Sequence, residues 1–99
     1  DPSAVPALIQ ALEDRNRDVR RAACEALGKL GDPSAVPALI QALKDEDSWV
    51  RMVACEVLGK LGDPSAVPAL IQALKDEHSW VREAARKALK RLGWQEAAG

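Results

Sequence analysis

This sequence of 99 residues has 15 acidic residues but only one histidine and two cysteines, the side chains that most often act as general base, reactive thiol or metal ligand. Its single histidine, His78, lies between Glu77 and Ser79. The nearest hydroxyl, that of Ser79, belongs to the adjacent residue, so the sequence does not indicate a nucleophile activated by a histidine base. The sequence contains no G-x-G-x-x-G motif, no phosphate-binding P-loop and no C-x-x-C motif. We therefore expect that the chain is not an enzyme and that it holds no cofactor and no metal.

The two cysteines, Cys24 and Cys55, are 31 residues apart. Stacked helices lie about 8–10 Å apart, whereas a disulfide requires Cα atoms within about 7 Å of each other. Two thiols without a neighbouring histidine are also too few for a zinc site. We expect free, buried thiols, which suit a reducing compartment and predict a cytoplasmic protein.

The elements that position these residues follow from a repeat of 31 residues. The segment DPSAVPALIQAL occurs three times unchanged, starting at Asp1, Asp32 and Asp63. A period of about 20–50 residues is typical of solenoids, whose units bury their apolar faces against one another. The sequence predicts one domain over residues 1–99, composed of repeats 1–31, 32–62 and 63–93 and a tail, 94–99.

Each repeat has the pattern of two helices. The first helix of the second repeat presents one apolar face, formed by Val36, Leu39, Ile40 and Leu43. Pro37 predicts a loose or 3₁₀ first turn, because proline has no N–H to donate. A second helix is predicted from about Ser48 to Leu61, before Gly62. We predict an all-α fold, an α-solenoid of three stacked antiparallel helix hairpins.

The repeated pattern D-P-x-A-V-P-A-L-I-x-A-L-x-D, followed by V-R-x-x-A and L-G-K-L-G, resembles the short HEAT-like repeats of the phycobilin-lyase type. It is also similar to artificial consensus HEAT-like binding scaffolds. The resemblance covers residues 1–93. It implies adaptor or scaffold roles, with partners bound along the surface of successive second helices.

The repeats differ from one another most along one stripe of the second helix. Shared packing constrains buried positions and leaves exposed ones free to vary, so we expect this stripe to be exposed. Large apolar residues on an exposed stripe are typical anchors of protein interfaces. We predict a protein-binding site at Trp49, Met52, Val53, Glu56, Lys60, Trp80 and Glu83. The alternative is that Trp49 and Trp80 only cover the loop between the two helices.

The sequence thus predicts a non-enzymatic scaffold that binds a protein partner or a second copy of itself. Two other interpretations stay open: a designed or consensus repeat protein with no partner beyond itself, and an accessory subunit of a bilin-lyase-type system, which only the resemblance implies. A formal net charge of −1 disfavours nucleic acid as a partner, although the third repeat has two more basic than acidic residues. No apolar run is long enough to cross a membrane.

The two ends of the solenoid are expected to differ. In the third repeat, Arg86 and Lys90 replace the cysteine and the glycine of the earlier repeats, which indicates a C-terminal cap that faces water. The first helix of the first repeat is identical to its internal copies, so its outer side is expected to be open and apolar. Either the chain is a segment of a longer solenoid or this end packs on another copy.

A further set of repeated residues predicts a structural role. Arginine and aspartate recur at the period, and we expect them to form a ladder of ion pairs that orients the loops: Arg20, Arg51 and Arg82 with Asp14, Asp45 and Asp76.

Overall fold

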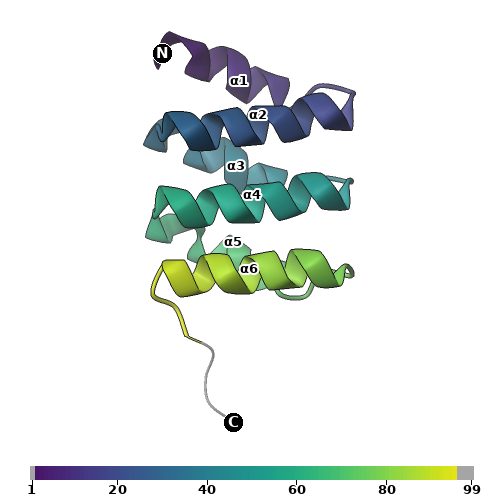
Figure 1. Ribbon diagram of the computed structural model, residues 1–99, viewed down its shortest axis with the longest axis vertical. Coiled ribbons are helices and arrows are strands. Elements are labelled where there is room, and N and C mark those ends of the chain that lie inside the picture. The colour runs from purple at the N-terminus through teal and green to yellow at the C-terminus, as the bar shows by residue number, and fades with distance from the viewer. Residues whose placement is uncertain (1, 96–99) are drawn as a thin grey trace.

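The computed structural model describes residues 2–95 and contains six α-helices, with no β-strand in that range (Figure 1). Each repeat consists of a short 3₁₀ helix, a short first α-helix and a longer second α-helix. In chain order these are η1 (Pro2–Ala4), α1 (Val5–Ala11) and α2 (Arg17–Leu30); η2 (Pro33–Ala35), α3 (Val36–Ala42) and α4 (Ser48–Leu61); and η3 (Pro64–Ala66), α5 (Val67–Ala73) and α6 (Ser79–Arg91).

The three hairpins stack in chain order along the longest dimension of a molecule that measures 45 × 24 × 16 Å. The second helices, α2, α4 and α6, form one layer, and the first helices, α1, α3 and α5, form the layer behind it (Figure 1). The predicted all-α solenoid of three hairpins is confirmed. None of the helices in residues 2–95 is long and apolar enough to cross a membrane.

The first helices begin in the way that the prolines predict. The Asp32 side chain accepts a hydrogen bond of 2.8 Å from the Ser34 N–H, which starts the 3₁₀ turn η2. The α-helix starts only at Val36, so Pro37 lies in its first turn, where a missing N–H leaves no hydrogen bond unmade. Asp63 and Ser65 repeat this arrangement in the third repeat.

The second helices end in two different ways. Gly31 and Gly62 have φ angles of 67° and 74°, and each donates its N–H to the carbonyl four residues earlier. After α6, the Trp94 N–H donates to the Leu89 carbonyl at 2.9 Å and the Gly93 N–H donates to that of Lys90 at 3.0 Å. These two bonds form a Schellman motif, and Trp94 packs against the core.

The core is continuous through all three repeats, and the second helices approach one another closely. A Cβ atom at Gly28 would lie 3.0 Å from Val57, and one at Gly59 would lie 2.9 Å from the Ala88 Cα. The glycines at these positions therefore allow the second helices to pack closely. Cys24 and Cys55 are free and buried, as predicted, and burial raises their pKa to about 12.

The predicted arginine ladder is present at the two junctions between repeats, as Arg20 with Asp45 and Arg51 with Asp76. Within residues 2–95, Arg82 and the Asp14 carboxylate form no ladder ion pair. Arg51 Nε donates to Asp76 Oδ2 at 2.7 Å, and its Nη1 donates to the Asp45 carbonyl at 2.7 Å. Arg20 makes the same ion pair with Asp45, at 2.8 Å. Each guanidinium thus ties its own loop to the loop of the following repeat through short, charge-assisted hydrogen bonds.

Candidate functional site

The outward side of α4 and α6 carries the most exposed aromatic residues of the described chain. Trp49 is 55% exposed and Trp80 is 50% exposed. Both lie in the first turn of their helices, and Met52, half-buried against the core, lies one turn further along α4. We name this surface the B-face and define it by Trp49, Met52, Glu56, Lys60, Trp80, Glu83, Lys87 and Arg91.

The structure places six of the seven predicted binding residues on the B-face, but not Val53. That side chain is only 5% exposed, so the prediction that it is an accessible anchor is wrong. The equivalent residue of the first repeat, Ala22, is exposed, whereas that of the third repeat, Ala84, is buried. Val53 is therefore covered by the preceding repeat, on the side of α4 that packs against α2.

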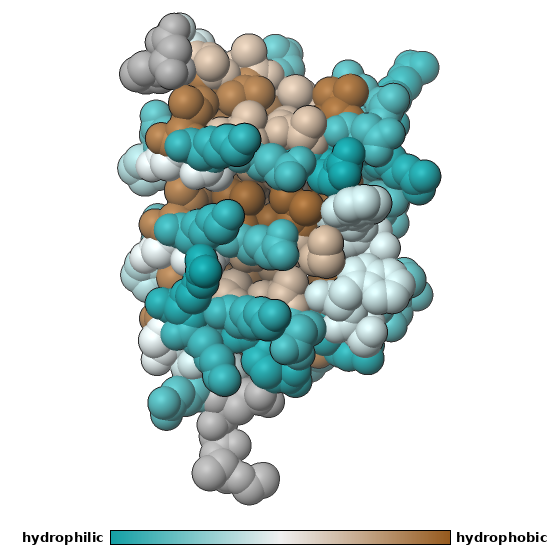
Figure 2. Space-filling model, in the orientation of Figure 1, coloured by the Kyte–Doolittle hydropathy of each residue, from teal (hydrophilic) through white to brown (hydrophobic). Residues whose placement is uncertain are grey.

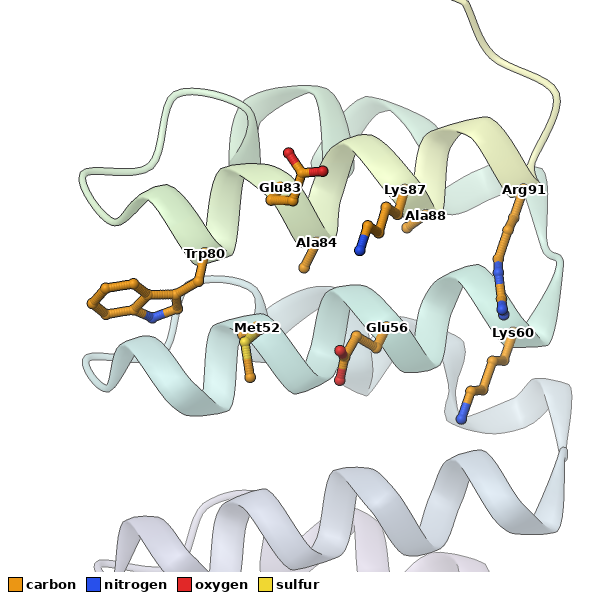
Figure 3. A pocket seen from close by; sticks show the side chains of 9 residues that line it. All are labelled: Met52, Glu56, Lys60, Trp80, Glu83, Ala84, Lys87, Ala88 and Arg91. Atoms are coloured by element: carbon orange, nitrogen blue, oxygen red, sulfur yellow. The ribbon is translucent and has the colours of Figure 1, made fainter.

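A groove of about 420 Å³ runs between α4 and α6 across the B-face (Figure 3). Its floor includes Ala84 and Ala88, whose small buried side chains let the two helices approach. Trp80 lies at one end of the groove, and Lys60 and Arg91 lie at the other (Figure 3). The remaining lining residues are Met52, Glu56, Glu83 and Lys87.

Both tryptophan rings are held on one side by a neighbouring side chain. The Arg21 guanidinium lies over the Trp49 ring, 4.6 Å from its centroid, in a cation–π contact. The His78 ring stacks on Trp80 with centroids 4.6 Å apart and an angle of 27° between the rings. The rings are therefore oriented, yet about half of each stays exposed.

The sequence reasoning did not assign Arg21 or His78 to the site. Arg21 occupies the position of Met52 one repeat earlier. Because equivalent positions of adjacent repeats are neighbours in a solenoid, the sequence did indicate that Arg21 lies near Trp49. His78 occupies the N-cap position of α6, but its side chain makes no cap hydrogen bond. Its imidazole stacks on Trp80 instead.

Charge along the groove is uneven. Glu83 lies toward the Trp80 end, Glu56 and Lys87 lie in the middle, and Lys60 and Arg91 lie at the far end (Figure 3). Glu83 pairs with Arg86 at 3.1 Å, whereas no ion pair within residues 2–95 joins the three cations to a carboxylate. The Lys60–Arg91 end of the groove therefore offers uncompensated positive charge beside apolar surface.

The chemistry that the B-face offers is burial of aromatic surface together with pairing of charges. Within the described residues, no three histidine, cysteine or acidic side chains are grouped as metal ligands would be. Cys24 and Cys55 lie in the core, away from the groove, and their raised pKa keeps them protonated at neutral pH.

Comparison with known proteins gives a clear family match. The model for HEAT repeats matches residues 5–90. A solved chain from the complex of CpcE and CpcF of phycocyanin lyase, from Nostoc sp. PCC7120, is 38% identical with a TM-score of 0.86, over 94% of this chain and 42% of that one. Human deoxyhypusine hydroxylase, in complex with glycerol, is 32% identical with a TM-score of 0.84, over 91% of this chain and 32% of that one. Comparison with curated protein sequences gives no match.

These matches correct one expectation from the sequence. The prediction that the chain is not an enzyme is wrong, because its structural neighbours include a hydroxylase and a lyase. One fold supports different activities according to the side chains placed on it, so missing catalytic motifs in one short chain do not separate it from enzymes. The chain spans less than half the length of either neighbour.

Proposed function

Because the chain belongs to the family of HEAT repeats, we propose that it is a docking module that binds a segment of a partner protein across the B-face. The observation that carries this proposal is the pair of half-exposed tryptophans beside a groove of about 420 Å³. Tryptophan is enriched among the few residues that dominate binding energy at protein interfaces.

The held orientation of the tryptophan rings supports this role. A side chain that is already ordered before binding loses little conformational freedom when a partner covers it, which leaves more of the contact energy as affinity. Arg21 orders Trp49 and His78 orders Trp80 in the free chain. Each ring can therefore act as a rigid platform for an apolar side chain of the partner.

The two cations at one end of the groove define what the partner segment contains. Its apolar anchor lies against Trp80 and Met52, and its acidic group lies at the Lys60–Arg91 end of the groove. Because these cations are exposed, the electrostatic share of the affinity falls as salt concentration rises. The partner is thus a segment with an apolar anchor and an acidic group, in the order that the groove sets.

The structural neighbours support a protein partner. One of them was solved as a complex of two chains, CpcE and CpcF. Its 38% identity also favours a second candidate function, an accessory subunit of a bilin-lyase-type assembly. That candidate predicts a change in visible absorbance when a bilin is added to the chain. We further propose a cytoplasmic location, which the two free, buried thiols support.

The experiment that tests the docking function is selection of a phage-displayed random peptide library on the immobilised chain. The test variant is Trp49→Ala with Trp80→Ala, and the matched control is Gln41→Ala with Gln72→Ala, two exposed positions on α3 and α5. Circular dichroism establishes that both variants keep their helices. We expect peptides enriched on the unmodified chain to bind the control equally and to lose at least tenfold in affinity on the tryptophan variant. Equal binding to the tryptophan variant would contradict the proposal.

A further inference from the structure

The groove of the B-face runs along α4 and α6, from the beginnings of both helices to their ends (Figure 3). In Figure 2 this layer of helices faces the viewer, with pale side chains where α4 and α6 begin and teal, hydrophilic ones where they end. Met52 and Lys60 are eight residues apart on α4, and Trp80 and Arg91 are eleven apart on α6. At a rise of about 1.5 Å per residue, the apolar and the basic ends of the groove are about 12–16 Å apart.

The basic end of the groove owes its arrangement to Gly59. A Cβ atom at Gly59 would lie 3.5 Å from the Arg91 Cδ, so the stem of Arg91 lies against α4 at the place where that helix has no side chain. The Arg91 side chain therefore extends from α6 toward α4 and Lys60 (Figure 3). Two like charges from two helices thus share this end, and neither pairs with a carboxylate within residues 2–95. Their complement is an acidic group of the partner segment.

The walls of the groove offer side chains but few backbone groups. The N–H and C=O groups inside a helix are paired with one another, so α4 and α6 leave none for a partner between their first and last turns. A segment that enters the groove must satisfy its own backbone, because a buried and unpaired N–H or C=O group is costly. An α-helix does so within a single segment. The groove therefore favours a helical partner, as does the opposite side of the same two helices, which α3 and α5 cover.

The helix termini set the direction of such a partner helix. Lys60 and Arg91 lie in the last turns of α4 and α6, so the negative ends of both helix dipoles are at the basic end of the groove. A partner helix that runs antiparallel to α4 and α6 brings its positive N-terminal end to this place. Acidic side chains are stabilising in the first turn of a helix, and the acidic group that pairs with the two cations then lies in that turn. The dipoles and the charges therefore select the same direction.

We propose that the partner segment is an amphipathic α-helix that lies in the groove antiparallel to α4 and α6, an inference that rests on the proposed docking function. Its first turn carries an aspartate or glutamate that pairs with Lys60 and Arg91. A large apolar residue, eight or eleven positions later, packs against Trp80 and Met52, since these intervals span about 12 and 16 Å on one face of a helix. An extended segment would cover the same length in about four or five residues, at about 3.3 Å each.

A selection of random 16-residue peptides displayed on phage tests both the form and the direction of the partner segment. The enriched peptides that lose at least tenfold in affinity on the variant Trp49→Ala with Trp80→Ala are aligned with one another. We expect an acidic residue followed, eight or eleven positions later, by a large apolar residue. An interval of four or five positions, or an apolar residue that precedes the acidic one, would overturn the inference and leave the docking function standing. A selection that yields no peptide dependent on the tryptophans would overturn the docking function itself, and the inference with it.

A spin label on the bound peptide gives a second measurement of its direction. The most enriched peptide carries a nitroxide at its N-terminus or at its C-terminus, and the broadening of each backbone amide signal of the ¹⁵N-labelled chain is measured. We expect the N-terminal label to broaden the signal of Lys60 more than that of Trp80, and the C-terminal label to do the opposite. The reverse pattern would overturn the antiparallel direction.

The contact of the acidic residue is tested with charge variants at low ionic strength. Lys60→Gln with Arg91→Gln is expected to bind the enriched peptide at least fivefold more weakly, because both cations that face its first turn are removed. The matched control is Lys44→Gln with Lys75→Gln, two exposed lysines that do not line the groove, and it is expected to bind as the unmodified chain does. Equal binding by all three chains would overturn the pairing of the acidic residue with Lys60 and Arg91.

Discussion

The packing of α4 against α6 can be tested at a single glycine. Replacing Gly59 with alanine adds one methyl group to the helix, and in an open helix this change stabilises by about 1 kcal/mol. At this junction the new Cβ would lie 2.9 Å from the Ala88 Cα and 3.0 Å from its Cβ. Both atoms belong to a rigid helix that cannot move aside, so overpacking of about 1–3 kcal/mol opposes the gain. We expect the two terms to leave a net loss of up to about 2 kcal/mol in the free energy of unfolding.

Gly28→Ala is the matched control for this prediction. Its Cβ would meet only the side chain of Val57, 3.0 and 3.1 Å from the two methyl carbons, and no backbone atom of the next helix. A shift of a few tenths of an ångström relieves that contact, so we expect a smaller loss than at Gly59. Urea unfolding followed by circular dichroism measures both variants, with the m-value checked for constancy. A Gly59→Ala variant that gains about 1 kcal/mol would refute the close packing described here.

The arginine ladder, the stability at low pH and the reactivity of the two cysteines can each be tested separately. Arg51→Ala leaves the Asp76 carboxylate, only 11% exposed, without its guanidinium, and should lower the free energy of unfolding by roughly 2–3 kcal/mol, measured in urea. Burial alone raises the pKa of Asp76, but hydrogen bonds from Arg51 and the His78 N–H outweigh it and hold that pKa below its ordinary value. The unfolded chain therefore binds this proton first, so stability should fall as pH drops below about 4, and this slope should weaken in Asp76→Asn. Cys24 and Cys55, with pKa values of about 12, should react with a disulfide reagent only after denaturation; rapid reaction of the native chain at pH 8 would contradict their burial.

The fold could be predicted because its information is local and repeated three times. The proline and glycine positions set the ends of each helix, and the second helix predicted from Ser48 to Leu61 is the one observed. The substitution of Lys90 for glycine likewise predicted an end that faces water, and Lys90 is exposed. Each of these inferences needs only the pattern within one repeat or the comparison of two.

The B-face could be predicted only in part because a helical wheel describes one helix without its neighbours. Val53 shares a stripe with Trp49 and Met52, but the preceding repeat covers it. The stacking of His78 on Trp80 depends on how the loop turns before α6, which the pattern does not encode. The absence of catalytic motifs also could not show that the structural neighbours of this chain include an enzyme.

Binding of a partner segment to the B-face can be followed residue by residue in a nuclear magnetic resonance titration. The ¹⁵N-labelled chain is titrated with the peptide most enriched in the phage selection, and the shift of each backbone amide is mapped on the structure. We expect the largest shifts to cluster on α4 and α6 around Trp49, Met52 and Trp80, with the indole N–H signals of Trp49 and Trp80 among them. Shifts confined to α3 and α5, with both indole signals unmoved, would contradict it.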